Sequence, residues 1–196
     1  IAIWIKSTVT LILFGIGLSS LAGALMALVT NFAPNPFYLS DMITWMLGSV
    51  ANRSLLDIAL VLPFMVAGLL LLLSQRKGLT LLSLGEDTAS TLGLNLTTTR
   101  ICVVLGAGLA TGAAVSLAGV IGFVGIVTPH LVRPLVNYDP GRTIIPSAVL
   151  GGVFLVLIDV GVRIISTNVE LKIGVLAALV GAPVFIWIAS KSGRHG

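Results

Sequence analysis

The chain has 196 residues, of which 57% are hydrophobic and only 9% are charged. A soluble domain usually carries roughly 25% charged residues, so this composition excludes a soluble surface and predicts an integral membrane protein. The net charge of +4 does not indicate nucleic-acid binding, because the basic residues stand singly between apolar runs. The single cysteine, Cys102, excludes an internal disulfide and a cysteine-based metal cluster.

Charge-free intervals define the membrane segments, because a charge at the bilayer centre costs about 2.5–3.5 kcal/mol and one crossing needs about 20 residues. We therefore predict an all-α, polytopic transmembrane helical bundle, a single domain over residues 1–196. Prolines and asparagines within 31–36 end the first segment, and 37–50 reads as a short interfacial helix. The hydrophobic segments are 7–30, 54–74, 99–117, 120–136, 143–165 and 173–190.

Two of these assignments carry a further expectation. The glycine and proline content of 120–136 predicts a partial or irregular helix that is buried in protein rather than facing lipid. Small residues at three- and four-residue spacing along 106–114 predict close helix packing. The polar run within 88–99 is too short to cross and is assigned to the loop 75–98.

The basic residues predict the orientation of the chain. If the loop 75–98 is cytoplasmic, 8 Lys and Arg residues fall inside and 3 fall outside. The positive-inside rule then places 75–98, 134–142 and the C-terminus in the cytoplasm, with 31–53 and 166–172 outside.

The cytoplasmic loop contains one short helical pattern. Glu86 and Asp87 suit a helix N-terminus, where the helix dipole favours negative charge, and Gly93 is placed to end that helix. Ala89 and Leu92 lie three residues apart, so we expect both side chains to press into a groove on a partner protein.

Two carboxylate–arginine pairs stand four residues apart near the outer ends of their segments, Arg53 with Asp57 and Asp159 with Arg163. Residues at this spacing on a helix are neighbours and can pair. Two interpretations stay open: the charges neutralise each other at the interface, or the arginines dock a soluble partner.

His130 lies in a hydrophobic segment, where an ionisable group is a functional hypothesis by default. No carboxylate lies near it in sequence to form a metal or acid–base site, so we favour a structural histidine near the cytoplasmic interface. The chain contains no Gly-Lys dipeptide and hence no P-loop. If ATP drives this protein, another subunit binds it.

Several stretches together carry a family resemblance. Residues 84–93 read LGEDTASTLG, residues 119–133 read GVIGFVGIVTPHLVR, Asp159 and Arg163 follow, and Gly174 precedes GAPVFIW at 181–187. In this order they resemble the FecCD-type permeases, the membrane subunits of bacterial ABC importers for ferric siderophores, haem and vitamin B12. Members of that family have about ten spans, so the resemblance implies that this chain is the C-terminal part.

The resemblance implies a transport subunit, not an enzyme, in the bacterial cytoplasmic (inner) membrane. It would move an iron chelate or cobalamin inward by alternating access, with no cofactor and no metal site. The implied partners are the lipid bilayer, a second permease copy in a homodimer or pseudo-dimer, two cytoplasmic ATPase subunits, and a periplasmic or extracellular substrate-binding protein. The implied ATPase-coupling residues are Gly85, Glu86, Asp87, Ala89, Leu92 and Gly93. The proposed docking residues for the binding protein are Arg53, Arg163 and Lys172.

Two other classes were weighed against this one. A secondary transporter or channel subunit, the alternative, should show acidic residues within the membrane or broken helices around a midplane site. Only Asp57 and Asp159 approach that, each near a segment end and each beside an arginine. An intramembrane enzyme would need a nucleophile–base or metal set, which one histidine and one cysteine do not supply.

Overall fold

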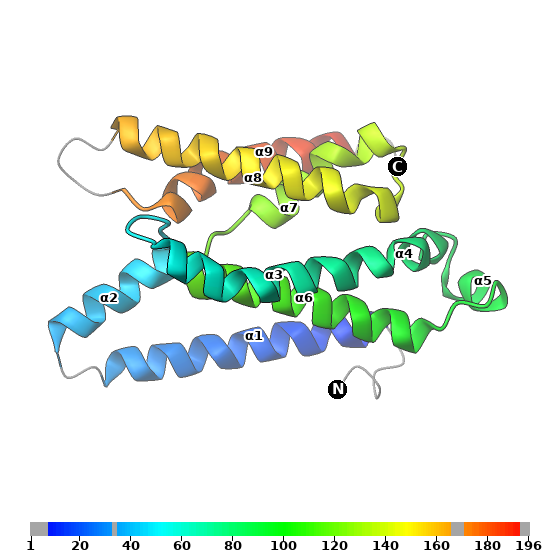
Figure 1. Cartoon of the computed structure of the whole chain (residues 1–196), viewed down its shortest axis with the longest axis horizontal. Helices are drawn as coiled ribbons and strands as arrows, with labels where there is room; N and C mark the ends of the chain where they lie inside the picture. Colours follow the sequence, from blue (N-terminus) through cyan, green and yellow to red (C-terminus); the bar gives the residue numbers. More distant parts are fainter. Residues whose placement is uncertain (1–7, 33–34, 166–170, 193–196) are drawn as a thin grey trace. The chain divides into compact units, whose positions relative to one another are not determined.

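The protein is described by a computed structural model that covers residues 8–32, 35–165 and 171–192. The chain divides into two compact units, residues 1–44 and residues 45–196. Every regular element in the described ranges is a helix, as the composition predicts (Figure 1). The all-α prediction is therefore confirmed.

The first unit contains α1 (Thr8–Asn31) and most of α2 (Pro36–Leu47). The predicted break between them is confirmed. The side-chain Oδ1 of Asn35 accepts the N–H of Phe37 at 3.0 Å, and Pro36 opens α2 at the one helical position where its missing N–H costs nothing.

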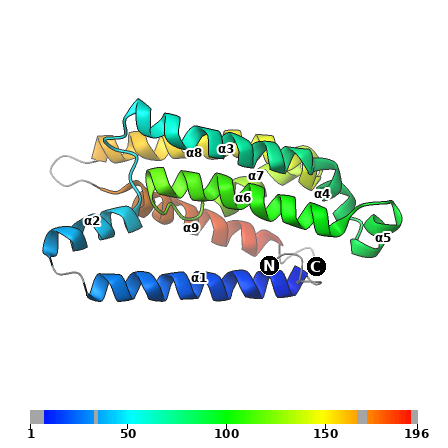
Figure 2. The same ribbon diagram turned by 60° about the horizontal axis from the view of Figure 1, so that its bottom comes forward.

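The second unit is built around an antiparallel pair, α3 (Leu55–Ser74) and α6 (Leu96–Ala118), which lie side by side in Figures 1 and 2. A Cβ at Gly68 would stand 2.6 Å from the carbonyl oxygen of Gly106 and 2.7 Å from the amide of Ala110. Glycine therefore permits backbone contact between these two helices. The predicted close packing is confirmed at Gly106 and Ala110, whereas a Cβ added at Gly108 or Gly112 would meet no atom within 4 Å outside the backbone of its own helix.

The remaining helices of this unit are α7 (Val124–Val132), the 3₁₀ helix η1 (Arg133–Val136), α8 (Pro140–Ile165) and α9 (Ile173–Ser192). With 9 residues, α7 is only about 13.5 Å long and cannot cross a bilayer. It packs against both α8 and α9, and its Val127 and Val132 are fully buried. The expected partial helix is confirmed, but it is buried on one face only, because Ile126 and Leu131 are 48% and 40% exposed.

Within the described ranges, four helical stretches are long and apolar enough to cross a membrane: Val9–Asn31, Leu55–Ser74, Leu96–Ala118 and Pro140–Ile165. Val124–Val136 and Ile173–Ile188 are shorter apolar helices. The segments predicted to start at residues 99 and 143 belong to helices that begin earlier, at Leu96 and Pro140. The prediction was too late because the capping residues lie upstream of the apolar runs. The Asn95 side chain caps α6 by accepting the N–H of Thr98 at 3.0 Å.

The segment predicted as a loop over 75–98 is more ordered than expected. It contains α4 (Arg76–Leu82) and α5 (Glu86–Thr91) before α6 begins. Both short helices lie at the end of the unit where α3 finishes and α8 starts (Figure 1).

Candidate functional site

The helix α5 is bounded by two glycines with left-handed backbone. Gly85 has φ +96° and Gly93 has φ +87°, a region that a side chain would strain. After α5 the amide of Leu94 donates to the carbonyl of Ala89 at 3.0 Å, which turns the chain back toward α6. The predicted helix and its Gly93 end are confirmed, and α5 projects beyond the ends of α3 and α6 (Figure 1).

An ion pair ties α5 to α6. The Oε2 of Glu86 lies 2.6 Å from the Nη2 of Arg100. The Arg100 side chain is 14% exposed and that of Glu86 42%, so solvent screens the pair only in part. Sequence reasoning assigned Glu86 to the helix dipole and missed this partner, since no local spacing relates residues on different helices.

The two apolar residues of the predicted contact face point in different directions. Leu92 is 58% exposed, whereas Ala89 is 0% exposed, buried within its own chain. The expectation that the Ala89 methyl group fills a groove on a partner is therefore wrong. Leu84, on the other side of Gly85, is as exposed as Leu92, so an exposed leucine stands at each end of α5.

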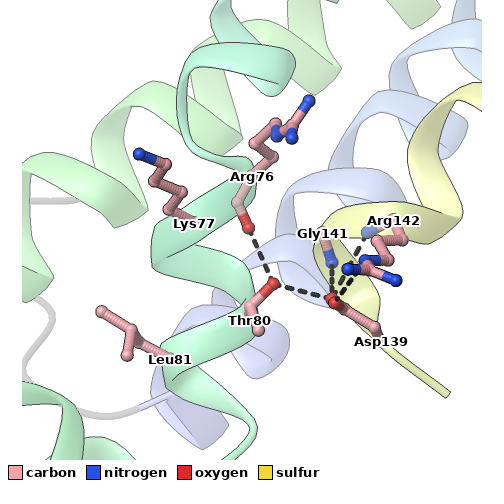
Figure 3. A pocket seen from close by; sticks show the side chains of 7 residues that line it. All are labelled: Arg76, Lys77, Thr80, Leu81, Asp139, Gly141 and Arg142. Carbon is pink, nitrogen blue, oxygen red and sulfur yellow. Dashed lines mark hydrogen bonds and ion pairs between the residues drawn. The ribbon is translucent and has the colours of Figure 1, made fainter. Parts of the chain in front are cut away.

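A second cluster, centred on Asp139, joins α4 to the start of α8 (Figure 3). Its Oδ1 accepts the hydroxyl of Thr80 at 2.7 Å and the amide of Gly141 at 2.8 Å. A Cβ at Gly141 would collide with the carbonyl oxygen of Arg76, so α4 and α8 touch through their backbones. The hydrogen bond from Thr80 is the main cause that lowers the pKa of Asp139, aided by the amides of Gly141 and Arg142.

Sequence reasoning did not single out this cluster, although part of it was legible. Aspartate directly before proline, as in Asp139-Pro140, is the pattern of a helix N-cap followed by the first helical residue. Nothing in the sequence indicated that Thr80, 59 residues away, would donate to the same carboxylate.

Beside this cluster lies a cavity of about 390 Å³. Arg76, Lys77 and Arg142 contribute three cationic side chains to its wall, against the single carboxylate of Asp139 (Figure 3). Thr80, Leu81 and Gly141 complete the lining. We call this the basic cavity.

The opposite end of the unit carries a depression of about 370 Å³. Arg163 and Lys172 line it together with Asp159, and Ser49, Ala51 and Asn52 form another wall. Arg53 follows these residues directly and is exposed. The structure thus brings Arg163 and Lys172 to one depression and places the loop that bears Arg53 beside it.

The two predicted carboxylate–arginine pairs have different outcomes. The Nε of Arg163 lies 2.8 Å from the Oδ2 of Asp159, as expected. Asp57 instead forms a capping box with Ser54: its Oδ2 accepts the Ser54 amide at 2.9 Å, and the Ser54 hydroxyl oxygen accepts the Asp57 amide at 3.1 Å. The helix start of α3 therefore uses the carboxylate that was expected to pair with Arg53.

His130 has local structural contacts. Its Nδ1 lies 2.9 Å from the carbonyl oxygen of Ile126 in the same helix, and its ring meets that of Phe185 edge to face at 6.2 Å. Among the residues that the structure describes, no three His, Cys, Asp or Glu side chains gather as a metal site would need. These contacts favour the structural interpretation.

Comparison with known proteins agrees with the resemblance. Residues 5–191 match the FecCD transport family. The uncharacterized ABC transporter permease protein YvrB of Bacillus subtilis (strain 168) is 38% identical over 190 residues, which cover 97% of this chain and 53% of that protein. The vitamin B12 import system permease protein BtuC of Salmonella typhi is 38% identical over 193 residues, 96% of this chain and 57% of that protein.

A solved structure has the same fold. It is described as an inward-facing conformation of a metal-chelate type ABC transporter, and it matches with a TM-score of 0.88 and 32% identity over 95% of this chain and 60% of that one. The chain thus spans somewhat more than half the length of these relatives. With the family match over nearly all its residues, the chain belongs to the FecCD transport family.

Proposed function

We propose that this chain is the membrane-spanning permease subunit, or the C-terminal part of it, of a binding-protein-dependent ABC importer in the bacterial cytoplasmic membrane. The family membership and the four apolar spans support this role. A separate ATPase subunit supplies the energy, a role that the family membership supports. A second permease copy completes the pathway, and residues 1–196 act as one permease domain.

The cargo is cobalamin or an iron chelate, either a siderophore complex or haem. The relatives named for vitamin B12 import support the first, and the solved metal-chelate type transporter supports the second. Uptake of radiolabelled cobalamin, ferric siderophore and haem by cells whose only such permease is the full-length protein distinguishes them. Uptake of none of the three, with the subunit present in the membrane, contradicts the proposal.

The coupling element is α5 with its flanking glycines. The observation that carries this assignment is a six-residue helix held outside the bundle. A helix this short is marginal in water without packing. Its inner face is fixed by buried Ala89 and by the pair of Glu86 with Arg100. Leu84 and Leu92 remain exposed on the outside, available to pack against the ATPase.

The decisive experiment replaces Leu92 by Gln in the full-length permease that is co-expressed with its ATPase. We expect normal membrane insertion, and loss of most permease-stimulated ATP hydrolysis and transport. Leu135→Gln is the matched control, since Leu135 is an exposed leucine at the same end of the unit, outside α5. If the Leu92→Gln variant supports as much ATP hydrolysis and transport as the Leu135→Gln control, α5 is not the coupling element.

The depression at the other end of the unit is the proposed docking site for the substrate-binding protein. It lies where α3 begins, whereas α5 lies beyond the end of α3, whose 20 residues are about 30 Å long. This separation supports the assignment of the two surfaces to opposite sides of the membrane. Arg53, Arg163 and Lys172 provide positive charge there. Arg53→Glu with Lys172→Glu should slow association with an acidic binding protein and remove its salt dependence. Unchanged association contradicts this assignment.

The secondary-transporter alternative is not favoured by the structure. Asp57 is engaged in the capping box of α3, and Asp159 is paired with Arg163 near the end of α8. Neither carboxylate lies at the middle of a span, where an ion-coupling site is expected. Stimulation of the ATPase by the reconstituted permease separates the two functions.

A further inference from the structure

The basic cavity lies at the level of the membrane surface. Arg76 stands two residues beyond Ser74, the last residue of one apolar span, and Arg142 is the third residue of another. Both residues therefore lie within one helical turn of the end of an apolar span, where the membrane surface is expected. The coupling helix α5 projects further out from the bundle (Figure 1), so the cavity is set back from the surface proposed to meet the ATPase.

The charges of the cavity are unbalanced. Three cationic residues, Arg76, Lys77 and Arg142, line it together with one carboxylate, that of Asp139. That carboxylate accepts hydrogen bonds from Thr80 and Gly141, and Arg142 approaches it only to 3.5 Å. Arg76 and Lys77 make no ion pair within the described part of the chain. Two to three cations are thus left for an anion.

An apolar stripe leads from the cavity along α8. Its members follow Arg142 at intervals of three and four residues, so they share one face of the helix. Each of them is at least half exposed: Ile145, Val149, Val153 and Val156. A cationic pocket at the membrane surface that continues into an exposed apolar stripe is complementary to an amphiphile with an anionic head and a hydrocarbon tail.

We propose that the basic cavity binds the phosphodiester head group of an anionic phospholipid from the cytoplasmic leaflet, with an acyl chain along the Arg142 face of α8. Basic pockets between membrane helices on this side recognise such head groups by charge. The inference needs only that the chain spans a membrane with this end of the unit in the cytoplasm, so it does not depend on the cargo or on the coupling role of α5.

Native mass spectrometry of the full-length permease in detergent tests the proposal with dioleoylphosphatidylglycerol, dioleoylphosphatidylcholine and inorganic phosphate as probes. We expect retention of phosphatidylglycerol over phosphatidylcholine. Arg76→Gln with Arg142→Gln should weaken it roughly 30-fold, since each cation contributes about fivefold at an anionic surface. Arg133→Gln is the control, because Arg133 is exposed at the same end and does not line the cavity. Equal thermal unfolding of all three proteins shows that they are folded.

Several results overturn the proposal. Equal retention of the two lipids, or equal losses in the double variant and the control, removes the site. Retention of phosphatidylglycerol no stronger than that of inorganic phosphate makes it a free-phosphate site. Unchanged lipid retention with loss of ATPase assembly assigns the cations to the ATPase instead.

Discussion

Glu86 and Arg100 join two helices that are separated in sequence by the turn at residues 92–95, with 2.6 Å between carboxylate and guanidinium. Through this pair the first turn of α5 is attached to the second turn of α6. We therefore expect a displacement of α5 to be passed to α6, and from α6 to α3 through the close approach of Gly106 to Gly68.

The first prediction concerns this attachment. Glu86→Gln should lower stability by only about 1 kcal/mol, because Glu86 is partly exposed. It should reduce permease-stimulated ATP hydrolysis by up to about 30-fold, the range expected for residues that carry coupling. Glu86→Arg with Arg100→Glu should restore part of the loss. If the Glu86→Gln variant stimulates ATP hydrolysis as strongly as the wild type, the pair of Glu86 with Arg100 carries no coupling.

The second prediction separates the two faces of α5. Ala89→Leu should destabilise the protein by about 1–3 kcal/mol, because Ala89 is fully buried and a larger side chain overpacks its site. Thr88→Leu, at the exposed neighbouring position, should leave stability within about 0.5 kcal/mol of wild type. Thermal unfolding in detergent measures both, and equal midpoints would mean that Ala89 is not packed as described.

The third prediction concerns the α3–α6 contact. Gly68→Ala places a methyl group 2.6 Å from the carbonyl oxygen of Gly106 and must push the helices apart, at a cost of about 1–3 kcal/mol. Gly108→Ala, where nothing lies within 4 Å, should be neutral or stabilising by up to about 1 kcal/mol. The thermal unfolding midpoint should thus fall in Gly68→Ala and stay unchanged or rise in Gly108→Ala. Similar shifts would exclude a backbone contact at Gly68.

The fourth prediction concerns the pH dependence of the Asp139 cluster. The hydrogen bond from Thr80 lowers the pKa of Asp139 below its usual 3.8, so the folded protein binds this proton less readily than the unfolded chain. The resulting stability is present above pH 3.8 and is lost as the pH falls through the lower, folded pKa. Thr80→Val should raise the pKa of Asp139, as followed by carboxyl carbon NMR, and reduce that loss.

The control for this experiment is Thr98→Val, an exposed threonine in the first turn of α6. It should leave the titration of Asp139 unchanged. An identical titration curve in Thr80→Val would show that the hydroxyl does not govern the carboxylate.

Much of the fold was predictable from the sequence, because a bilayer imposes length and polarity on each segment separately. The break before Pro36, the partial helix α7 and the short helix that ends at Gly93 all follow from local chemistry. The predictions of where each helix starts were less accurate. Polar caps such as Asn95 lie outside the apolar run that hydropathy detects.

What the sequence by itself determined is which residues can occupy hydrocarbon, where the chain must turn, and which short segment stands apart from the spans. The tertiary structure alone decided that Ala89 faces inward while Leu92 faces outward, that Glu86 meets Arg100, and that Thr80 reaches Asp139. The physical reason is that hydropathy and turn chemistry act along the chain. Contacts between helices depend on how each helix is rotated about its axis. They also depend on where small residues, such as Gly68 and Gly106, let two backbones touch.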